Sequence, residues 1–448
     1  MSKFLKLMSV LAIVALIAVP AFAEVQNVKV SGDIDSKMIT RNNYDFNNYK
    51  TSGADEDTWF MSTTRVQIDA DLTDNVATCV RLLNQRDWNV ENDAKTDLDL
   101  DLSYVKLKEM FYAPLTMTIG RQNIRLGNGL VVGKPNTFTG TAVQASDLSE
   151  RKSFDAIRAT LDYNPLVVDL IMAKITAGTN VGTSKNDDDT NLYGINAAYK
   201  FNQYNSEVEA YIITKNARSA TLESDKVNVY GVRGSLEPIS KLVVNGELAM
   251  QNGDYRASGV SLDRSAYAID LGAAYAIDYK WSPKVALNYI YRSGQKNQGN
   301  GGADADVNSA SKYKAWDKMY EDQTYGIIAN RIFDGNNDGV ESNGSTINVM
   351  ASVVPVQDLT VAVDYYNFML AQKWKTSDAD IRLLNGSNSY YVNANKALGQ
   401  EVDLSLGYDY TEDVKLGLVA GFFLPGKAFS VQNNDMASTV MADVKVSF

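Results

Sequence analysis

Apolar and polar residues alternate along the last segment of the chain, residues 438–448. The apolar positions on one face are Val440, Ala442, Val444 and Val446, and the segment ends on the aromatic Phe448. The other face is mostly polar and includes Asp443 and Lys445. An alternation with period two predicts a β-strand that separates an apolar from a polar environment.

The same alternation recurs in segments of strand length along the whole chain. In 265–277, for example, Tyr267 and Leu271 alternate with Ala268 and Asp270. The pattern predicts about eighteen strands, most of them long enough to cross a bilayer when tilted. We expect them near 28–41, 58–72, 76–88, 97–110, 115–125, 153–163, 166–175, 191–201, 206–215, 226–235, 241–251, 265–277, 283–292, 345–354, 359–369, 400–410, 414–423 and 438–448.

Connections of two kinds alternate between these strands. Short turns rich in Pro, Asn and Asp are expected, for example, at 163–165, 237–238 and 355–358. The long polar connections include 126–152, 294–344 and 370–399. Residues 324–333 also have a strand-like pattern, but one more strand would make the count odd, so we assign them to the large loop. The chain is therefore predicted to be all-β, a single transmembrane antiparallel β-barrel with short periplasmic turns and long extracellular loops.

Aromatic residues gather near the short turns. They are Phe111, Tyr112, Tyr163, Tyr199, Phe201, Tyr279, Trp281, Tyr408, Tyr410 and Phe448. This distribution predicts an aromatic girdle at one membrane interface. A terminal Phe after an alternating strand also resembles the signal that the barrel-assembly machinery reads, so we expect that machinery to bind Phe448.

The first residues have the features of a secretory signal peptide. Lys3 and Lys6 precede an apolar stretch at 7–19, and a small-x-small cleavage site follows at 21–23. The apolar stretch is shorter than the roughly 20 residues of a transmembrane helix. We expect a signal peptide at 1–23 and the barrel at 24–448, in the outer membrane of a Gram-negative-type bacterium in contact with lipid and lipopolysaccharide.

Composition excludes several classes of function. The chain has 43 basic and 54 acidic residues and a net charge of −11, which argues against a nucleic-acid partner. It has no histidine, and Cys79 is its single cysteine, so His-dependent catalysis and an internal disulfide are excluded. We therefore expect no enzymatic activity, although a carboxylate pair such as Glu401 and Asp403 is an alternative acid/base site.

Several short segments resemble the alginate-export porin family, whose fold is an eighteen-stranded outer-membrane barrel. They are Gly120-Arg121-Gln122 with Gly127 and Gly129, the segment 153–158, Ser293-Gly294 followed by Trp316 and Met319-Tyr320, the segment 398–404 and the segment 421–426. The resemblance implies a passive channel for a hydrophilic solute and a monomeric barrel.

Charged residues of both signs fall on the predicted inner faces of the strands. The basic candidates for pore lining are Arg65, Arg81, Arg121, Arg158, Arg233 and Arg292. The acidic candidates are Asp69, Glu247, Asp270, Glu401 and Asp403. They form either a selectivity ladder or a solvated wall of cross-strand ion pairs. A conduit for an anionic polysaccharide needs a cationic constriction, so the mixed signs argue against alginate as the solute.

The leading hypothesis is an outer-membrane channel for hydrophilic solutes, with oligo- and polysaccharides among the candidates. Loops 126–152 and 294–344 are long enough to fold inward and narrow it. The alternative is a structural or adhesive barrel with a blocked lumen and partner-binding outer loops. No cofactor is expected apart from one calcium candidate, in which Asp334, Asn336 and Asp338 have the spacing of an EF-hand loop but can equally form a solvated turn.

Overall fold

The computed structural model describes residues 27–47, 56–89, 98–135, 145–176, 189–218, 225–257, 260–296, 311–333, 340–374, 381–383 and 389–448. The expected signal peptide at 1–23 and the calcium candidate at 334–339 lie outside these residues.

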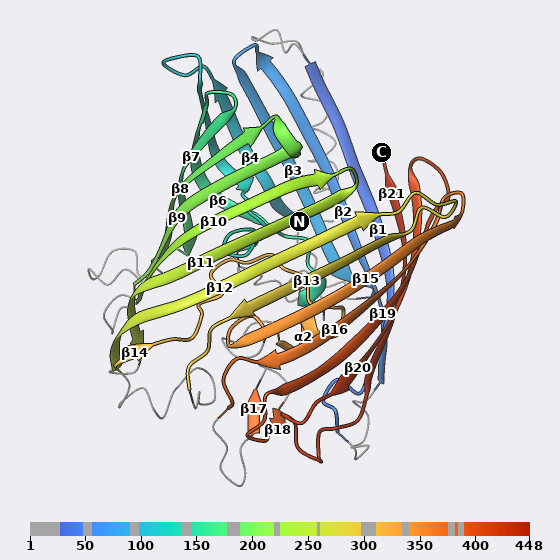
Figure 1. The fold of residues 1–448 in the computed structure, drawn as a ribbon. Helices are drawn as coiled ribbons and strands as arrows, with labels where there is room; N and C mark the ends of the chain where they lie inside the picture. Colours follow the sequence, from blue (N-terminus) through green and yellow to red (C-terminus); the bar gives the residue numbers. More distant parts are fainter. Residues whose placement is uncertain are drawn as a thin grey trace.

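Eighteen long strands of the described chain form a closed antiparallel barrel (Figure 1). They are β1 (Asn27–Asn42), β2 (Glu56–Thr73), β3 (Val76–Asp87), β4 (Leu98–Lys108), β5 (Leu115–Asn123), β6 (Ser153–Asp162), β7 (Leu166–Thr176), β8 (Thr190–Phe201), β9 (Ser206–Ala217), β10 (Asp225–Ile239), β11 (Leu242–Ala257), β12 (Val260–Ala276), β13 (Lys284–Arg292), β15 (Gly344–Val356), β16 (Leu359–Leu370), β19 (Ala397–Asp409), β20 (Val414–Pro425) and β21 (Ala437–Ser447). The barrel closes where β1 pairs with β21, from Asp33 opposite Ser447 to Asn42 opposite Ser438. The predicted fold class is confirmed.

The remaining elements are short and belong to the loops. β14 (Lys312–Tyr313) pairs in parallel with β12, and β17 (Ile381–Leu383) pairs with β18 (Ser389–Tyr391). The helical elements are η1 (Ser146–Leu148), η2 (Gln203–Asn205) and α2 (Ala329–Phe333). Among the residues described, none of the helices has the length and hydropathy needed to cross a membrane.

The two faces of each strand differ as the alternation predicts. On β12, Tyr267, Leu271 and Tyr275 are exposed on the outside, whereas Ala268 and Asp270 are buried. The ring of strands satisfies the backbone hydrogen bonds, so an apolar outer surface can face lipid without unpaired polar groups. All ten residues of the expected aromatic girdle are exposed, and the hydroxyl groups of Tyr112 and Tyr163 lie 2.5 Å apart across neighbouring turns.

Of two turns predicted at prolines, the one at 237–238 is wrong, and the one at 355–358 is confirmed only in its last two residues, 357–358. β10 continues through Pro238 to Ile239, and β15 continues through Pro355 to Val356. In both strands the register shifts next to the proline, after Leu236 and after Val353. A bulge of this kind accommodates a residue that has no N–H group to donate to the ladder.

The prediction of a loop between the strands at 241–251 and 265–277 is also wrong. β11 and β12 extend into one long hairpin, in which Arg256 lies opposite Ser261. Arg264 stabilises the hairpin at its outer end. Its guanidinium lies 2.8 Å from Asp225 and stacks over the rings of Tyr255 and Tyr313. Because these residues extend beyond the apolar band, their outward face is polar and includes Asp254, Ser261 and Asp263, so the outward apolar positions that mark a spanning strand are lost.

Residues 324–333 belong to the large loop, as assigned from the sequence, but their strand-like pattern has another origin. The last five residues form helix α2, and Ile328, Ile332 and Phe333 are fully buried. Phe333 packs against Phe368 of the wall, with ring centroids 6.2 Å apart. The apolar positions therefore reflect packing against the barrel wall inside the ring.

Candidate functional site

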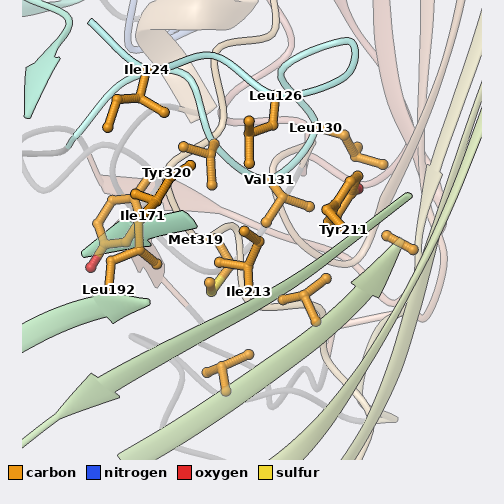
Figure 2. Packing of buried hydrophobic residues seen from close by; sticks show 14 of the residues in the cluster. Ile124, Leu126, Leu130, Val131, Ile171, Leu192, Tyr211, Ile213, Met319 and Tyr320 are labelled. Carbon is orange, nitrogen blue, oxygen red and sulfur yellow. The ribbon is translucent and has the colours of Figure 1, made fainter. Parts of the chain in front are cut away.

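Two loops fold into the barrel and bind each other there. One is the segment 124–135 after β5, and the other is the segment 311–333 between β13 and β15. The amide of Tyr320 donates to the carbonyl of Val131 at 2.9 Å, and that of Gly133 donates to the carbonyl of Tyr320 at 2.7 Å. Figure 2 shows that Val131 and Met319 lie in one apolar cluster with Ile213 of the wall. The loops therefore form one body attached to the wall, as the sequence predicted for inward folding.

Carboxylates of the wall hold the first loop by its backbone. Glu247 accepts hydrogen bonds from the amide of Asn128 at 2.8 Å and from the hydroxyl of Tyr211 at 2.6 Å. Glu209 accepts one from the amide of Gly127 at 3.0 Å. Gly127 has a φ of +54°, and a Cβ on it would lie 2.7 Å from the Glu247 carboxylate. Only glycine permits this close approach of the loop.

Carboxylates of β19 hold the second loop, 311–333, in the same way. Glu401, which is 0% exposed, accepts hydrogen bonds from the amides of Ile328 and Ala329 at 2.7 and 2.8 Å. Asp403 accepts one from the amide of Ile327 at 3.2 Å. Gly326 has a φ of +92°, and a Cβ on it would lie 2.7 Å from the Glu401 carboxyl group. The carboxylate pair considered as an acid/base site thus binds backbone amides under the loop.

The six candidate arginines all form ion pairs. Most pairs join adjacent strands, and several are bidentate. The partners are Asp33 and Glu150 for Arg65, Asp101 for Arg81, Asp155 for Arg121, Asp169 for Arg158, Glu207 for Arg233 and Glu321 for Arg292. In the two pairs of Arg121 and Arg158, both carboxylate oxygens lie 2.7–2.8 Å from the guanidinium. The five arginines other than Arg121 face the lumen, and each therefore presents little net charge to a passing solute.

The candidate residues divide into three groups. Arg65, Arg81, Arg158 and Asp69 lie on neighbouring strands β2 to β6, and Asp69 accepts a hydrogen bond from Gln67 at 2.8 Å. The prediction that Arg121 lines the pore is wrong, because it lies opposite Asp155 on the outer face with the exposed Ile119 and Ile157, whereas its neighbour Gln122 is buried on the inner face. Arg233, Glu247 and Asp270 meet around Asn128, whose side chain contacts Arg233 at 2.7 Å and Asp270 at 3.1 Å. Glu401 and Asp403 lie beneath α2, and Arg292 contacts the loop through Glu321.

Sequence reasoning missed the loop residues that complete these groups. Asn128 binds three wall strands through its side chain and backbone. Asp322 binds Arg125 and Lys152. Gly127 and Gly129 on either side of Asn128 were the one available signal, because paired glycines mark a tight, close-approaching loop.

Two carboxylates of the 311–333 loop have shifted pKa values. Burial raises the pKa of Asp317, but Lys215 and Arg264 outweigh it and hold the pKa at about 2. For Glu321, burial dominates over the opposing effect of Arg292 and raises the pKa to about 7. Within the described ranges, no group of three or more Asp, Glu or Cys side chains is arranged to hold a metal ion.

Two cavities lie on either side of the loop residues Gln323 and Thr324, which line both. The first has a volume of about 170 Å³ and a charged lining of Lys and acidic side chains, including Lys152 and Asp322. The second has a volume of about 290 Å³ and is lined mainly by amide and hydroxyl side chains of the loops and of β11 to β16.

A closed barrel with an apolar exterior, an aromatic girdle and inward loops defines an outer-membrane channel of the porin type. The family model described as alginate export matches residues 33–443, so the chain belongs to the alginate export family. It lies in the outer membrane, and its architecture is that of a transport channel.

Solved structures of outer-membrane channels share the fold at low sequence identity. OpdQ of Pseudomonas aeruginosa is 11% identical, with a TM-score of 0.56 over 95% of this chain and 99% of that one. OccK2 (OpdF) of Pseudomonas aeruginosa, solved in complex with glucuronate, is 10% identical, with a TM-score of 0.53 over 95% and 100%. The outer membrane protein OpdK of the same organism is 9% identical, with a TM-score of 0.54 over 95% and 100%. No curated protein matches the chain.

Proposed function

We propose that the protein is a passive channel for small hydrophilic solutes and that it does not favour anions. The observation that carries this proposal is the pairing of the five lumen-facing arginines, Arg65, Arg81, Arg158, Arg233 and Arg292, with carboxylates. A cationic row that attracts a polyanion needs positive charge that is not neutralised within a few ångströms. The family name therefore does not extend to alginate as the solute here.

The inward loops set the size of the solute. They carry their own apolar core, in which Leu130 and Val131 are 0% and 1% exposed, so they narrow the lumen as a rigid body. The cavities beside Gln323 accept a small molecule and are too small for a folded polymer segment. A sugar-sized solute also fits the fold relative that was solved with glucuronate.

Planar-bilayer recording of the refolded chain 24–448 under a KCl gradient tests the proposal. We expect discrete channels whose reversal potential is either near zero or of the sign that indicates a preference for cations. Replacement of residues 314–333 by a short linker should give a larger single-channel conductance. A strongly anion-selective reversal potential would contradict the proposed selectivity.

Folded protein without conductance would instead support the alternative, a barrel with a blocked lumen and partner-binding outer loops. The monomeric state, contact with lipopolysaccharide and recognition of Phe448 by the assembly machinery belong to the same proposal. Each is open to direct measurement, and the first can be read from the mass of the detergent-solubilised protein.

A further inference from the structure

A row of asparagine side chains crosses the inner wall. Asn245 of β11 lies opposite Gly272 of β12, Gly272 lies opposite Asn288 of β13, and Asn288 lies opposite Asn348 of β15. The Asn288 amide donates to the Asn348 oxygen at 3.1 Å, and the Asn348 amide donates to Asp364 at 3.1 Å. We call Asn245, Asn288 and Asn348 the amide row.

Gly272 makes the amide row continuous. A Cβ at this position would lie 2.7 Å from Nδ2 of Asn245 and 2.9 Å from Oδ1 of Asn288. The two amide groups therefore meet over the glycine, in space that any other residue would fill. No element of the barrel requires glycine here by its backbone angles, so the space itself is what the glycine provides.

The first inward loop covers the amide row. Asn128 donates from Nδ2 to Oδ1 of Asn245 at 3.1 Å, and its carbonyl accepts a hydrogen bond from Gln323 at 3.0 Å. The cavity of about 290 Å³ lies between the row and the loops. Drug-sized ligands occupy sites of roughly 300–1,000 Å³, so this cavity has the size for a single sugar ring.

One hydroxyl group in the cavity lacks a partner. Thr346 lines the cavity and is 3% exposed, and its Oγ1 makes no hydrogen bond within the described part of the protein. A buried polar group without a partner is unfavourable, so binding of a guest that supplies a hydrogen bond to it is favoured. Thr346 lies on β15, on the same face as Asn348.

The chemistry of the lining matches a polyhydroxylated, uncharged molecule. Each side-chain amide has two N–H groups and two oxygen lone pairs, and the contacts within the row use only part of them. A sugar hydroxyl both donates and accepts, so it can bind the remaining positions. Asp270 is the charged lining residue, and it disfavours an anion in the cavity.

We propose that this cavity is a binding subsite for a neutral monosaccharide on the permeation path. The proposal rests on the proposed channel function and adds the class of solute. Glucose and glucuronate are suitable probes because they share a ring and differ by a carboxylate.

Block of the ion current by added sugar tests the subsite. We expect glucose to reduce the current in a saturable way. The concentration of glucuronate that blocks half of the current should be at least tenfold higher than that of glucose. Replacing two amides, in N288A/N348A, should raise the half-block concentration of glucose roughly tenfold, as expected for two lost hydrogen bonds. G272A should act in the same direction by displacing Asn245 and Asn288.

N228A is the matched control. Asn228 donates to Asn252 at 3.1 Å, the same bond as in the row, but it lies on the opposite face of β10 from the buried Val227 and Val229. The glucose concentration that blocks half of the current through N228A should equal that of the wild type. Migration of the unheated protein on gels confirms that each variant is folded before it is recorded, and the two independent variants keep the test open if one does not fold.

The outcomes separate the two proposals. A channel that conducts but is not blocked by glucose, or is blocked equally by glucuronate, overturns the subsite and leaves the channel function standing. A barrel that does not conduct overturns the channel function, and ligand-observed NMR of glucose with the refolded protein then decides the subsite alone. Binding that N288A/N348A does not weaken would overturn it there too.

Discussion

Glu401 is expected to hold the 311–333 loop inside the barrel, and Glu401→Gln is the perturbation that tests this. The carboxylate is fully buried and accepts two amide hydrogen bonds from the loop, at 2.7 and 2.8 Å. Glutamine has the same shape and can keep one of these bonds. Its NH₂ group, however, faces the second backbone amide donor, and that donor then loses its acceptor.

The cost of the change follows from these contacts. A hydrogen bond to a charged group contributes about 1.5–3 kcal/mol, and a buried donor left unpaired costs a similar amount. We therefore expect the docked state of the loop to lose about 3 kcal/mol. Since about 1.4 kcal/mol is a factor of ten in an equilibrium constant, the undocked population should rise roughly a hundredfold.

Trypsin cleavage at Arg331 measures the undocked population. Arg331 lies within α2, so the protease reaches it only after the loop leaves the wall. When opening and closing are fast compared with cleavage, the cleavage rate follows the open fraction. Asp409→Asn is the matched control, because Asp409 lies on the same strand but pairs with Lys415 at 3.1 Å in an exposed position.

Cleavage of Glu401→Gln at the wild-type rate, with an unchanged single-channel conductance, would refute this reasoning. It would mean that the apolar contacts of Ile328, Ile332 and Phe333 alone hold the loop. Equal acceleration in Asp409→Asn would show that the change acts on the barrel as a whole.

Three further predictions follow from the same contacts. Asp169→Asn removes the bidentate partner of Arg158, which faces the lumen, and should shift the reversal potential under a KCl gradient toward anions. Acid should release the 311–333 loop through Asp317. Burial raises the pKa of this carboxyl group, but Lys215 and Arg264 outweigh burial and lower the pKa to about 2, against 3.8 outside the fold. The resulting advantage of about 2 kcal/mol is complete above pH 3.8 and is lost as the pH falls through 2; current fluctuations should increase there in the wild type, and Asp317→Asn should show them already at neutral pH. Gly127→Ala should push the first loop off Glu247 and change single-channel conductance, which an unaltered conductance would contradict.

The strands could be predicted because the membrane imposes a simple rule on them. A residue facing lipid must be apolar and its neighbours face the lumen, so the pattern of a strand such as β12 identifies it without any tertiary contact. The rule fails where the strand leaves the bilayer, as at Arg256 and Ser261, which are paired in a hairpin although they give its outward face a polar character. It fails again at Pro238 and Pro355, because a bulge and a turn have the same local sequence.

The partners of the charged residues could not be predicted in the same way. Arg121 lies opposite Asp155, and a shift of one residue in the pairing would place the two on opposite faces. Sequence patterns locate strand ends less accurately than that. Glu401 binds main-chain amides, which every residue except proline has, so no side-chain pattern at Ile328 or Ala329 announces the contact.

Most carboxylates on the inner wall therefore have one of two structural roles and do not act on a solute directly. Carboxylates opposite arginines cancel their charge, and carboxylates opposite the loops bind backbone amides. When both sets are removed from consideration, the wall near Gln323 is left with the neutral amides of Asn245, Asn288 and Asn348 and with Asp270, which binds the side-chain amides of the two loops. A channel built from the same family pattern can thus lose preference for a polyanion without losing its arginines, because selectivity depends on which groups remain unpaired toward the lumen.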